Sequence, residues 1–267
     1  AASATADLNG KAVQMACEQI WNRLKTAASE ILSCEASLIS IHNELIHVNG
    51  NPAALTWNEL VIAAYLKRVS LSEHAHYATP DIHFDNTIEK GHPFAYHVYG
   101  TAITTVTVDC VRGIYETDAV QLVHDVGDSM NEMIDRGQIE GGIVQGIGWM
   151  TMEEIVFDAE GRLRSNALST YKVPDIYSVP RKLELNFLET SQDNLAIFRS
   201  KAVGEPPLMY GIGVYFALRN AIKAFNPNSD IGFSTPMTPE KVLGGLYSRK
   251  QQQSVAADNA SVTSTKS

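Results

Sequence analysis

The chain has 267 residues, of which 45% are hydrophobic and 19% are charged, and this composition is typical of a globular protein with one or two domains. Its formal net charge of −9 argues against a nucleic-acid-binding protein, because no basic stripe is available to neutralise phosphates. It also argues against binding to an anionic membrane surface. The sequence contains no apolar run of roughly 18 residues, so no transmembrane helix is predicted.

Three cysteines, Cys17, Cys34 and Cys110, are widely separated, and no Cys-x-x-Cys pair occurs. The chain therefore shows no zinc or iron–sulfur motif of its own. An odd number of unpatterned cysteines fits a reducing compartment, so we expect a cytoplasmic protein. Residues 248–267 are polar and are predicted to form a disordered tail, which leaves 1–247 as the folded region.

The first part of the chain predicts helices around short strands. Apolar residues at helical spacing predict a helix over 8–32, with Thr5 or Asp7 as its N-cap. Loose alternation over 36–49 suggests strands that end in a turn near 49–52.

A second helix is predicted over 56–67, because Thr56 and Glu59 have the spacing of a capping box. Five of the eight histidines fall between His74 and Tyr99. They could form a metal site, but no tight acidic pattern accompanies them, and histidines of strands and loops are the competing explanation.

The second part of the chain predicts a hairpin over 100–126 with a turn at Arg112-Gly113. The remaining predicted elements are a helix over 131–155, strands over 183–188 and 196–199, a helix over 211–225, and a short helix that starts at Thr238-Pro239. The mixture is typical of an α+β protein, and we place a lobe boundary near residue 100.

The helix over 131–155 is rich in glycine, with Gly137, Gly141, Gly142, Gly146 and Gly148 in one short stretch. Each glycine costs about 1 kcal/mol relative to alanine in a helix, so the stretch requires a reason. Glycines allow another backbone or a flat ligand to approach closely. We expect Gln138 and Gln145 on the same side as Gly141 and Gly142, where an amide could bind a polar heterocycle. Close helix packing with glutamines at the rim is the alternative.

Glu205 lies between Gly204 and the pair Pro206-Pro207. Proline fixes its own φ and restricts the preceding residue, so this carboxylate is held on a stiff segment. Such a carboxylate suits a general base that must be aimed at one atom. A rigid turn with a solvated glutamate is the alternative.

Three stretches together resemble the C-terminal, molybdenum-cofactor-binding region of the xanthine dehydrogenase family. They are Ala1-Ala2-Ser3-Ala4-Thr5-Ala6-Asp7, the run from Asn131 to Glu154, and Ser200-Lys201-Ala202-Val203-Gly204-Glu205-Pro206-Pro207-Leu208. The resemblance covers about residues 1 to 245 and implies part of the two-lobed molybdopterin-binding domain of molybdenum hydroxylases.

The resemblance also implies roles for individual residues. Glu205 matches the catalytic glutamate, a general base toward a molybdenum-bound hydroxyl, and Gln145 matches a glutamine beside the molybdenum ligands. Ser3, Ala4, Thr5 and Ala6 match the loop that holds the pterin and its phosphate, and Ala2 matches a small residue of the substrate pocket. No residue is expected to bind the metal directly, since the pterin dithiolene holds it. Ala6 replaces a common threonine, so one pterin contact is in doubt.

The implied activity is hydroxylation of hypoxanthine and xanthine to urate. Electrons would pass through 2Fe-2S clusters and FAD to NAD, all on partner chains, and the whole complex would be a dimer. The missing purine-selecting residues and the first half of the molybdenum domain would also belong to partner chains. A related hydroxylase acting on aldehydes or other N-heterocycles, and a non-catalytic scaffold subunit, are the alternatives.

Overall fold

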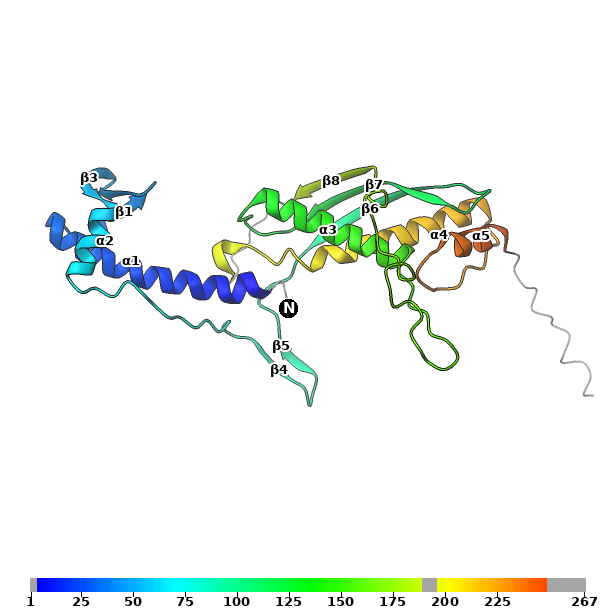
Figure 1. The fold of residues 1–267 in the computed structure, drawn as a ribbon, viewed down its shortest axis with the longest axis horizontal. Coiled ribbons are helices and arrows are strands. Elements are labelled where there is room, and N and C mark those ends of the chain that lie inside the picture. The colour runs from blue at the N-terminus through cyan, green and yellow to red at the C-terminus, as the bar shows by residue number, and fades with distance from the viewer. Residues whose placement is uncertain (1–3, 189–195, 249–267) are drawn as a thin grey trace, which may run out of the picture. The chain divides into compact units, whose positions relative to one another are not determined.

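The computed structural model describes residues 4–188 and 196–248, and its mixture of helices and sheets confirms the predicted α+β class. The described residues divide into two compact units (Figure 1). The first takes the described residues of Ala1–His97, Gly127–Met130 and Thr190–Ala202, and the second takes those of Val98–Val126, Asn131–Glu189 and Val203–Ser267. Residues 249–267, which include nearly all of the predicted tail, lie outside the described residues.

The first unit is built on a long helix and a three-stranded antiparallel sheet with the order β1-β2-β3. Its elements are η1 (Ala6–Gly10), α1 (Lys11–Leu32), η2 (Ala36–Leu38), β1 (Ile39–His42), β2 (Leu45–Val48), β3 (Asn51–Thr56), α2 (Trp57–Leu66), β4 (His83–Asp85), β5 (Lys90–His92) and η3 (Ile197–Arg199). Leu24 and Ala28 of α1 pack with Ile46 of β2 and Leu60 of α2 in its core. These four side chains anchor both helices to the sheet.

The capping box at the start of α2 is confirmed. The Thr56 hydroxyl accepts a hydrogen bond of 3.3 Å from the backbone N–H of Glu59, and the Glu59 carboxylate accepts one of 2.9 Å from the backbone N–H of Thr56. Two of the free N–H groups at the helix start are thereby satisfied.

Three expectations for the first unit are wrong. Thr5 and Asp7 do not cap the first helix, because Thr5 already has helical backbone angles and its side chain makes no capping bond. Residues 196–199 do not form a strand, because Ile197–Arg199 are the short helix η3 and Phe198 and Arg199 have positive φ angles of 50° and 60°. A third strand, β3, follows the turn at Asn49-Gly50 where no strand was expected.

The second unit contains a three-stranded sheet in which β6 and β7 are antiparallel and β7 and β8 are parallel. Its elements are β6 (Gly100–Val108), β7 (Tyr115–His124), α3 (Glu132–Thr151), β8 (Lys182–Phe187), η4 (Pro206–Ile212), α4 (Gly213–Phe225) and α5 (Pro239–Tyr247). The hairpin, the glycine-rich helix and the two last helices are confirmed, and Pro239 occupies the first turn of α5 as predicted.

The core of the second unit forms between the sheet and its helices. Figure 1 shows α3 running along this sheet. The fully buried side chains include Leu122 of β7, Ile143 of α3 and Leu218 of α4. This packing fixes α3 and the segment that enters α4, which carry the residues of greatest functional interest.

Candidate functional site

The glycine-rich helix α3 packs against η4, and two of its glycines make the contact possible. A Cβ atom added to Gly146 would lie 2.2 Å from the carbonyl oxygen of Leu208, and one added to Gly142 would lie 3.0 Å from Cβ of Pro207. On η4, a Cβ added to Gly211 would lie 2.4 Å from the carbonyl carbon of Gly146. The structure thus identifies the approaching backbone as η4, which directly follows Glu205.

Glu205 is the N-cap residue of η4 and its side chain is exposed. Pro206 and Pro207 form the first turn of that helix, and the Glu205 carbonyl accepts a hydrogen bond of 3.2 Å from Leu208 N–H. The stiff segment expected around Glu205 is therefore the start of a 3₁₀ helix. The carboxylate projects from an element whose backbone is fixed on α3.

Gln145 lies on α3 between Gly142 and Gly146, the two glycines that contact η4. The side chains of Gln145 and Gln138 are exposed, and the residue Gly141 is exposed too, whereas Gly142 is buried. The expectation that Gly142 shares the glutamine side is therefore wrong, because Gly142 faces η4. Gln145 and Glu205 thus belong to two elements that are in direct contact.

The predicted cofactor segment at the start of the chain is described only in part. Ala2 and Ser3 lie outside the described residues, and Ala4, Thr5 and Ala6 belong to helical turns rather than to a loop. Thr5 is exposed, so its hydroxyl can reach a bound group. The roles of these residues remain predictions from the resemblance.

A hydrogen-bonded tyrosine connects this segment to the chain before Glu205. The hydroxyl of Tyr96 donates a bond of 2.5 Å to the Asp7 carboxylate and accepts one of 2.9 Å from Ala202 N–H. Burial raises the pKa of Asp7 and, more strongly, the pKa of Tyr96. Tyr96 therefore stays protonated at neutral pH and keeps donating its hydrogen bond.

The described residues contain no group of three or more His, Cys, Asp or Glu side chains arranged to hold a metal ion. The histidines between His74 and Tyr99 include a cross-strand pair, His83 and His92 in β4 and β5. The predicted site residues on α3 and at the start of η4 are an amide, Gln145, and a carboxylate, Glu205. This donor set suits a cofactor that is held by hydrogen bonds and carries its own metal ligands.

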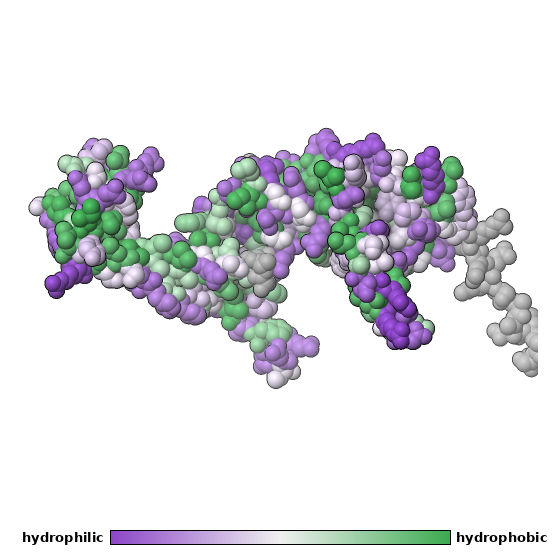
Figure 2. Space-filling view, viewed as in Figure 1, coloured by the Kyte–Doolittle hydropathy of each residue, from purple (hydrophilic) through white to green (hydrophobic). Residues whose placement is uncertain are grey.

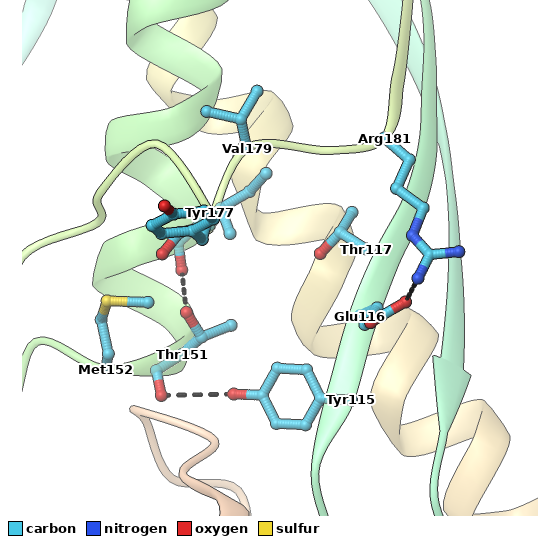
Figure 3. Close-up of a pocket in the computed structure, with 10 residues that line it drawn as sticks. Tyr115, Glu116, Thr117, Thr151, Met152, Tyr177, Val179 and Arg181 are labelled. Carbon is cyan, nitrogen blue, oxygen red and sulfur yellow. Dashed lines mark hydrogen bonds and ion pairs between the residues drawn. The ribbon is translucent and has the colours of Figure 1, made fainter.

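A separate cavity of about 220 Å³ lies between the start of β7, the end of α3 and residues 177–181 (Figure 3). Its lining includes Tyr115, Thr151 and the ion pair of Arg181 with Glu116. Burial raises the pKa of Tyr115 to about 12, and its hydroxyl donates 2.6 Å to the Met237 carbonyl. None of the predicted site residues lines this cavity.

None of the described helices combines the length and hydropathy that are needed to traverse a bilayer.

Comparison with known proteins identifies the family of this chain. Residues 1–180 match the family described as molybdopterin cofactor-binding domain. The chain is 37% identical over 249 residues to the xanthine dehydrogenase/oxidase of Felis catus and 35% identical over 244 residues to aldehyde oxidase 1 of Oryctolagus cuniculus. These matches cover 91% and 90% of this chain, but only 17% of each relative.

Among solved structures, quinoline 2-oxidoreductase from Pseudomonas putida 86 aligns with a TM-score of 0.77 and 26% identity. The alignment covers 93% of this chain and 31% of that one. The resemblance to the molybdenum-cofactor-binding region of xanthine dehydrogenases is thereby confirmed. The chain belongs to the molybdopterin cofactor-binding domain family.

Proposed function

We propose that this chain is the molybdopterin-binding part of a xanthine dehydrogenase that hydroxylates hypoxanthine and xanthine to urate. The observation that carries the proposal is that Glu205 is exposed at the start of η4, and that η4 packs on α3, the helix that carries Gln145. The 37% identity to a xanthine dehydrogenase/oxidase supports the choice of substrate class.

In this proposal Glu205 is the general base. A carboxylate oxygen of Glu205 accepts the proton that is released when the substrate carbon is hydroxylated. The backbone of η4 is fixed by its contacts with Gly142 and Gly146, so the carboxylate is aimed before substrate binds. Such positioning converts an ordinary carboxylate into an effective base.

The other predicted residues bind the cofactor. The Gln145 amide can donate hydrogen bonds to the edge of the cofactor and accept them from it. The Thr5 hydroxyl and the backbone N–H groups of Ser3, Ala4 and Ala6 would bind the pterin and its phosphate. Ala2 would line the substrate pocket. When bound, the molybdenum cofactor supplies the two-electron redox chemistry, while the protein supplies position and the base.

The proposal includes further polypeptide that carries the 2Fe-2S clusters, FAD and NAD sites, in a dimer of the whole complex. The chain spans about a sixth of the length of the curated relatives it matches, which supports this view. Large apolar side chains are also exposed, among them Ile62, Leu66, Phe198 and Met133, and Figure 2 shows hydrophobic residues on the surface of the molecule. Extensive exposed apolar surface marks contacts with other protein.

The test is xanthine-dependent NAD reduction by the assembled holoenzyme, scaled to bound molybdenum, with and without Glu205→Gln. Loss of a general base typically lowers the rate by about 10²–10⁴-fold, and molybdenum content should be unchanged. Glu160→Gln is the matched control, because Glu160 is exposed in a turn. Equal rates for Glu205→Gln and the wild type would show that Glu205 is only a turn residue.

A related hydroxylase that acts on aldehydes or N-heterocycles is the second candidate. It is favoured by the 35% identity to an aldehyde oxidase and the structural match to a quinoline oxidoreductase. A substrate panel on the holoenzyme separates the two, since brisk aldehyde or quinoline turnover without purine turnover would replace the first proposal. A purified complex without molybdenum would instead indicate a scaffold subunit.

A further inference from the structure

Tyr210, on the same short helix that Glu205 caps, makes an unusually specific contact with the sheet of the second unit. Its hydroxyl lies 2.6 Å from Nδ1 of His124, and the two rings meet edge to face with centroids 5.4 Å apart. His124 is the last residue of β7 and stands opposite Gly100 of β6 in the strand register.

Gly100 provides the space for the Tyr210 hydroxyl. A Cβ atom at position 100 would lie only 1.9 Å from that oxygen, so no larger residue fits while the contact is kept. Gly100 of β6 and His124 of β7 together therefore fix the position of the hydroxyl oxygen of Tyr210. None of them is among the residues that the family resemblance assigns to the cofactor or the substrate.

The environment of His124 makes the contact with Tyr210 energetically important. The imidazole is 0% exposed, and its Nε2 atom has no hydrogen-bond partner among the described residues. A buried polar ring with one unsatisfied nitrogen depends on the bond that it does make, because a buried polar group without a hydrogen bond loses its solvation and gains nothing in return. Burial lowers the pKa of His124, so the ring is neutral and can accept from, or donate to, the Tyr210 hydroxyl.

The position of Tyr210 on η4 connects this contact to Glu205. The glycines of α3 touch η4 at Pro207, Leu208 and Gly211, and Tyr210 fixes its side toward the sheet. A 3₁₀ helix rises about 2 Å per residue, so Tyr210 holds η4 about 10 Å along its axis from Glu205. The helix η4 is therefore held by two different neighbours, α3 and the sheet, so it cannot tilt or rotate freely. The N-cap residue Glu205 is fixed with it.

We propose that His124 and Tyr210, with the space left by Gly100, are a positioning pair that sets the orientation of η4 and hence of the Glu205 carboxylate. The inference rests on the proposed role of Glu205 as the base. His124 and Tyr210 act through Glu205 and do not themselves contact the reacting atoms. An active-site group displaced by about 1 Å can lose as much as 10²-fold in rate, which makes such a pair functionally significant.

The test uses the assembled holoenzyme with Tyr210→Phe, which removes only the hydroxyl, and Gly100→Ala, which fills its space. Each variant is made in the wild type and in Glu205→Gln, and kcat and KM are measured; single-turnover product formation serves for the slow variants. Tyr177→Phe is the matched control, because the Tyr177 side chain is 92% exposed. Amide hydrogen exchange at Leu208, which bonds the Glu205 carbonyl, reports the order of η4 independently of activity.

We expect Tyr210→Phe and Gly100→Ala to lower kcat roughly tenfold, with KM changed less than about twofold and faster exchange at Leu208. In the Glu205→Gln background the same substitutions should change kcat by less than about twofold, since residues that act as one unit are not additive. That pattern, with Tyr177→Phe unchanged, supports the pair.

Two other results overturn the positioning role while leaving the base intact. One is an unchanged kcat for both variants when Glu205→Gln is strongly impaired. The other is an equal loss in both backgrounds, which would indicate a general structural effect. Full activity of Glu205→Gln would instead overturn the proposed base, and the positioning role with it.

Discussion

Gly146 of α3 and Gly211 of η4 are in direct backbone contact: a Cβ atom on Gly211 would lie 2.4 Å from the Gly146 carbonyl carbon and 2.5 Å from its Cα. Neither residue can carry a side chain without separating the two elements. This contact is the reason that α3 tolerates glycine at position 146, although a helical glycine is disfavoured by about 1 kcal/mol relative to alanine.

Gly146→Ala should therefore separate η4 from α3. We expect a loss of stability of about 1–3 kcal/mol, because the new methyl group has no room and its neighbour is backbone. Thermal unfolding and the rate of the assembled protein measure the effect, and both should fall. Gly137→Ala on the same helix is the control, since nothing lies within 4 Å of its added Cβ, and it should be neutral or stabilising by up to about 1 kcal/mol. Equal stability of the two variants would contradict the packing argument.

Gln145→Leu should reduce cofactor retention while leaving the fold intact, because the side chain is exposed and its proposed role is to hydrogen-bond the cofactor. The measurement is molybdenum per protein after gel filtration. Gln138→Leu, two turns earlier and also exposed, is the control and should retain the metal. If both variants keep full molybdenum, Gln145 is a rim residue of helix packing, which is the alternative raised by the sequence.

His124 predicts a pH dependence of local stability. Burial lowers the pKa of His124, and the charges of Asp125 and Asp135 oppose this shift only in part. At pH values between the lowered pKa and about 6.5, the unfolded state therefore binds a proton that the folded state does not. Stability is then fully present above about pH 6.5 and falls as the pH is lowered, with a slope of at most about 1.4 kcal/mol per pH unit from this residue.

Hydrogen exchange of β7 amides as a function of pH measures this slope. It should flatten in His124→Gln and persist in His83→Gln, because His83 is exposed in β4. A slope that is the same in all three proteins would show that another group is responsible.

Thr56→Ala should destabilise α2 by about 1 kcal/mol, since it removes one half of the capping box. Glu59→Gln should cost less, because glutamine can make the same reciprocal bond. Exchange rates of the α2 amides distinguish the two. Equal protection in the wild type and Thr56→Ala would mean that packing against the core, through Leu60 and Ala64, holds the helix without the cap.

Local signals in the sequence predicted local structure well. The capping box at Thr56, the turn at Arg112-Gly113 and the proline at the start of α5 depend on neighbouring residues, and all are confirmed. The glycines of α3 predicted a close approach, and the structure identifies the approaching segment as η4.

Features that depend on residues distant in the chain could not be predicted in this way. Nothing near β8 indicates that it pairs in parallel with β7, and nothing near His124 indicates Tyr210 as its partner. The strand predicted over 196–199 failed because the positive φ at Phe198 and Arg199 is unusual for these residue types, and alternation of apolar residues carries no sign of it. The roles of Glu205 and Gln145 were suggested by their neighbours in the sequence and made specific by the family resemblance, and they stay predictions.

The path of the chain has a practical consequence for anyone who wishes to divide this protein. The first unit includes Gly127–Met130 and the described part of Thr190–Ala202, which the chain supplies only after it has entered the second unit. Gly127 bridges to Ser200, and the Lys201 ammonium donates 3.0 Å to the His97 carbonyl. A protein cut after residue 97 would leave the first unit without these later segments, so this unit is not a contiguous piece that can be produced by a single cut.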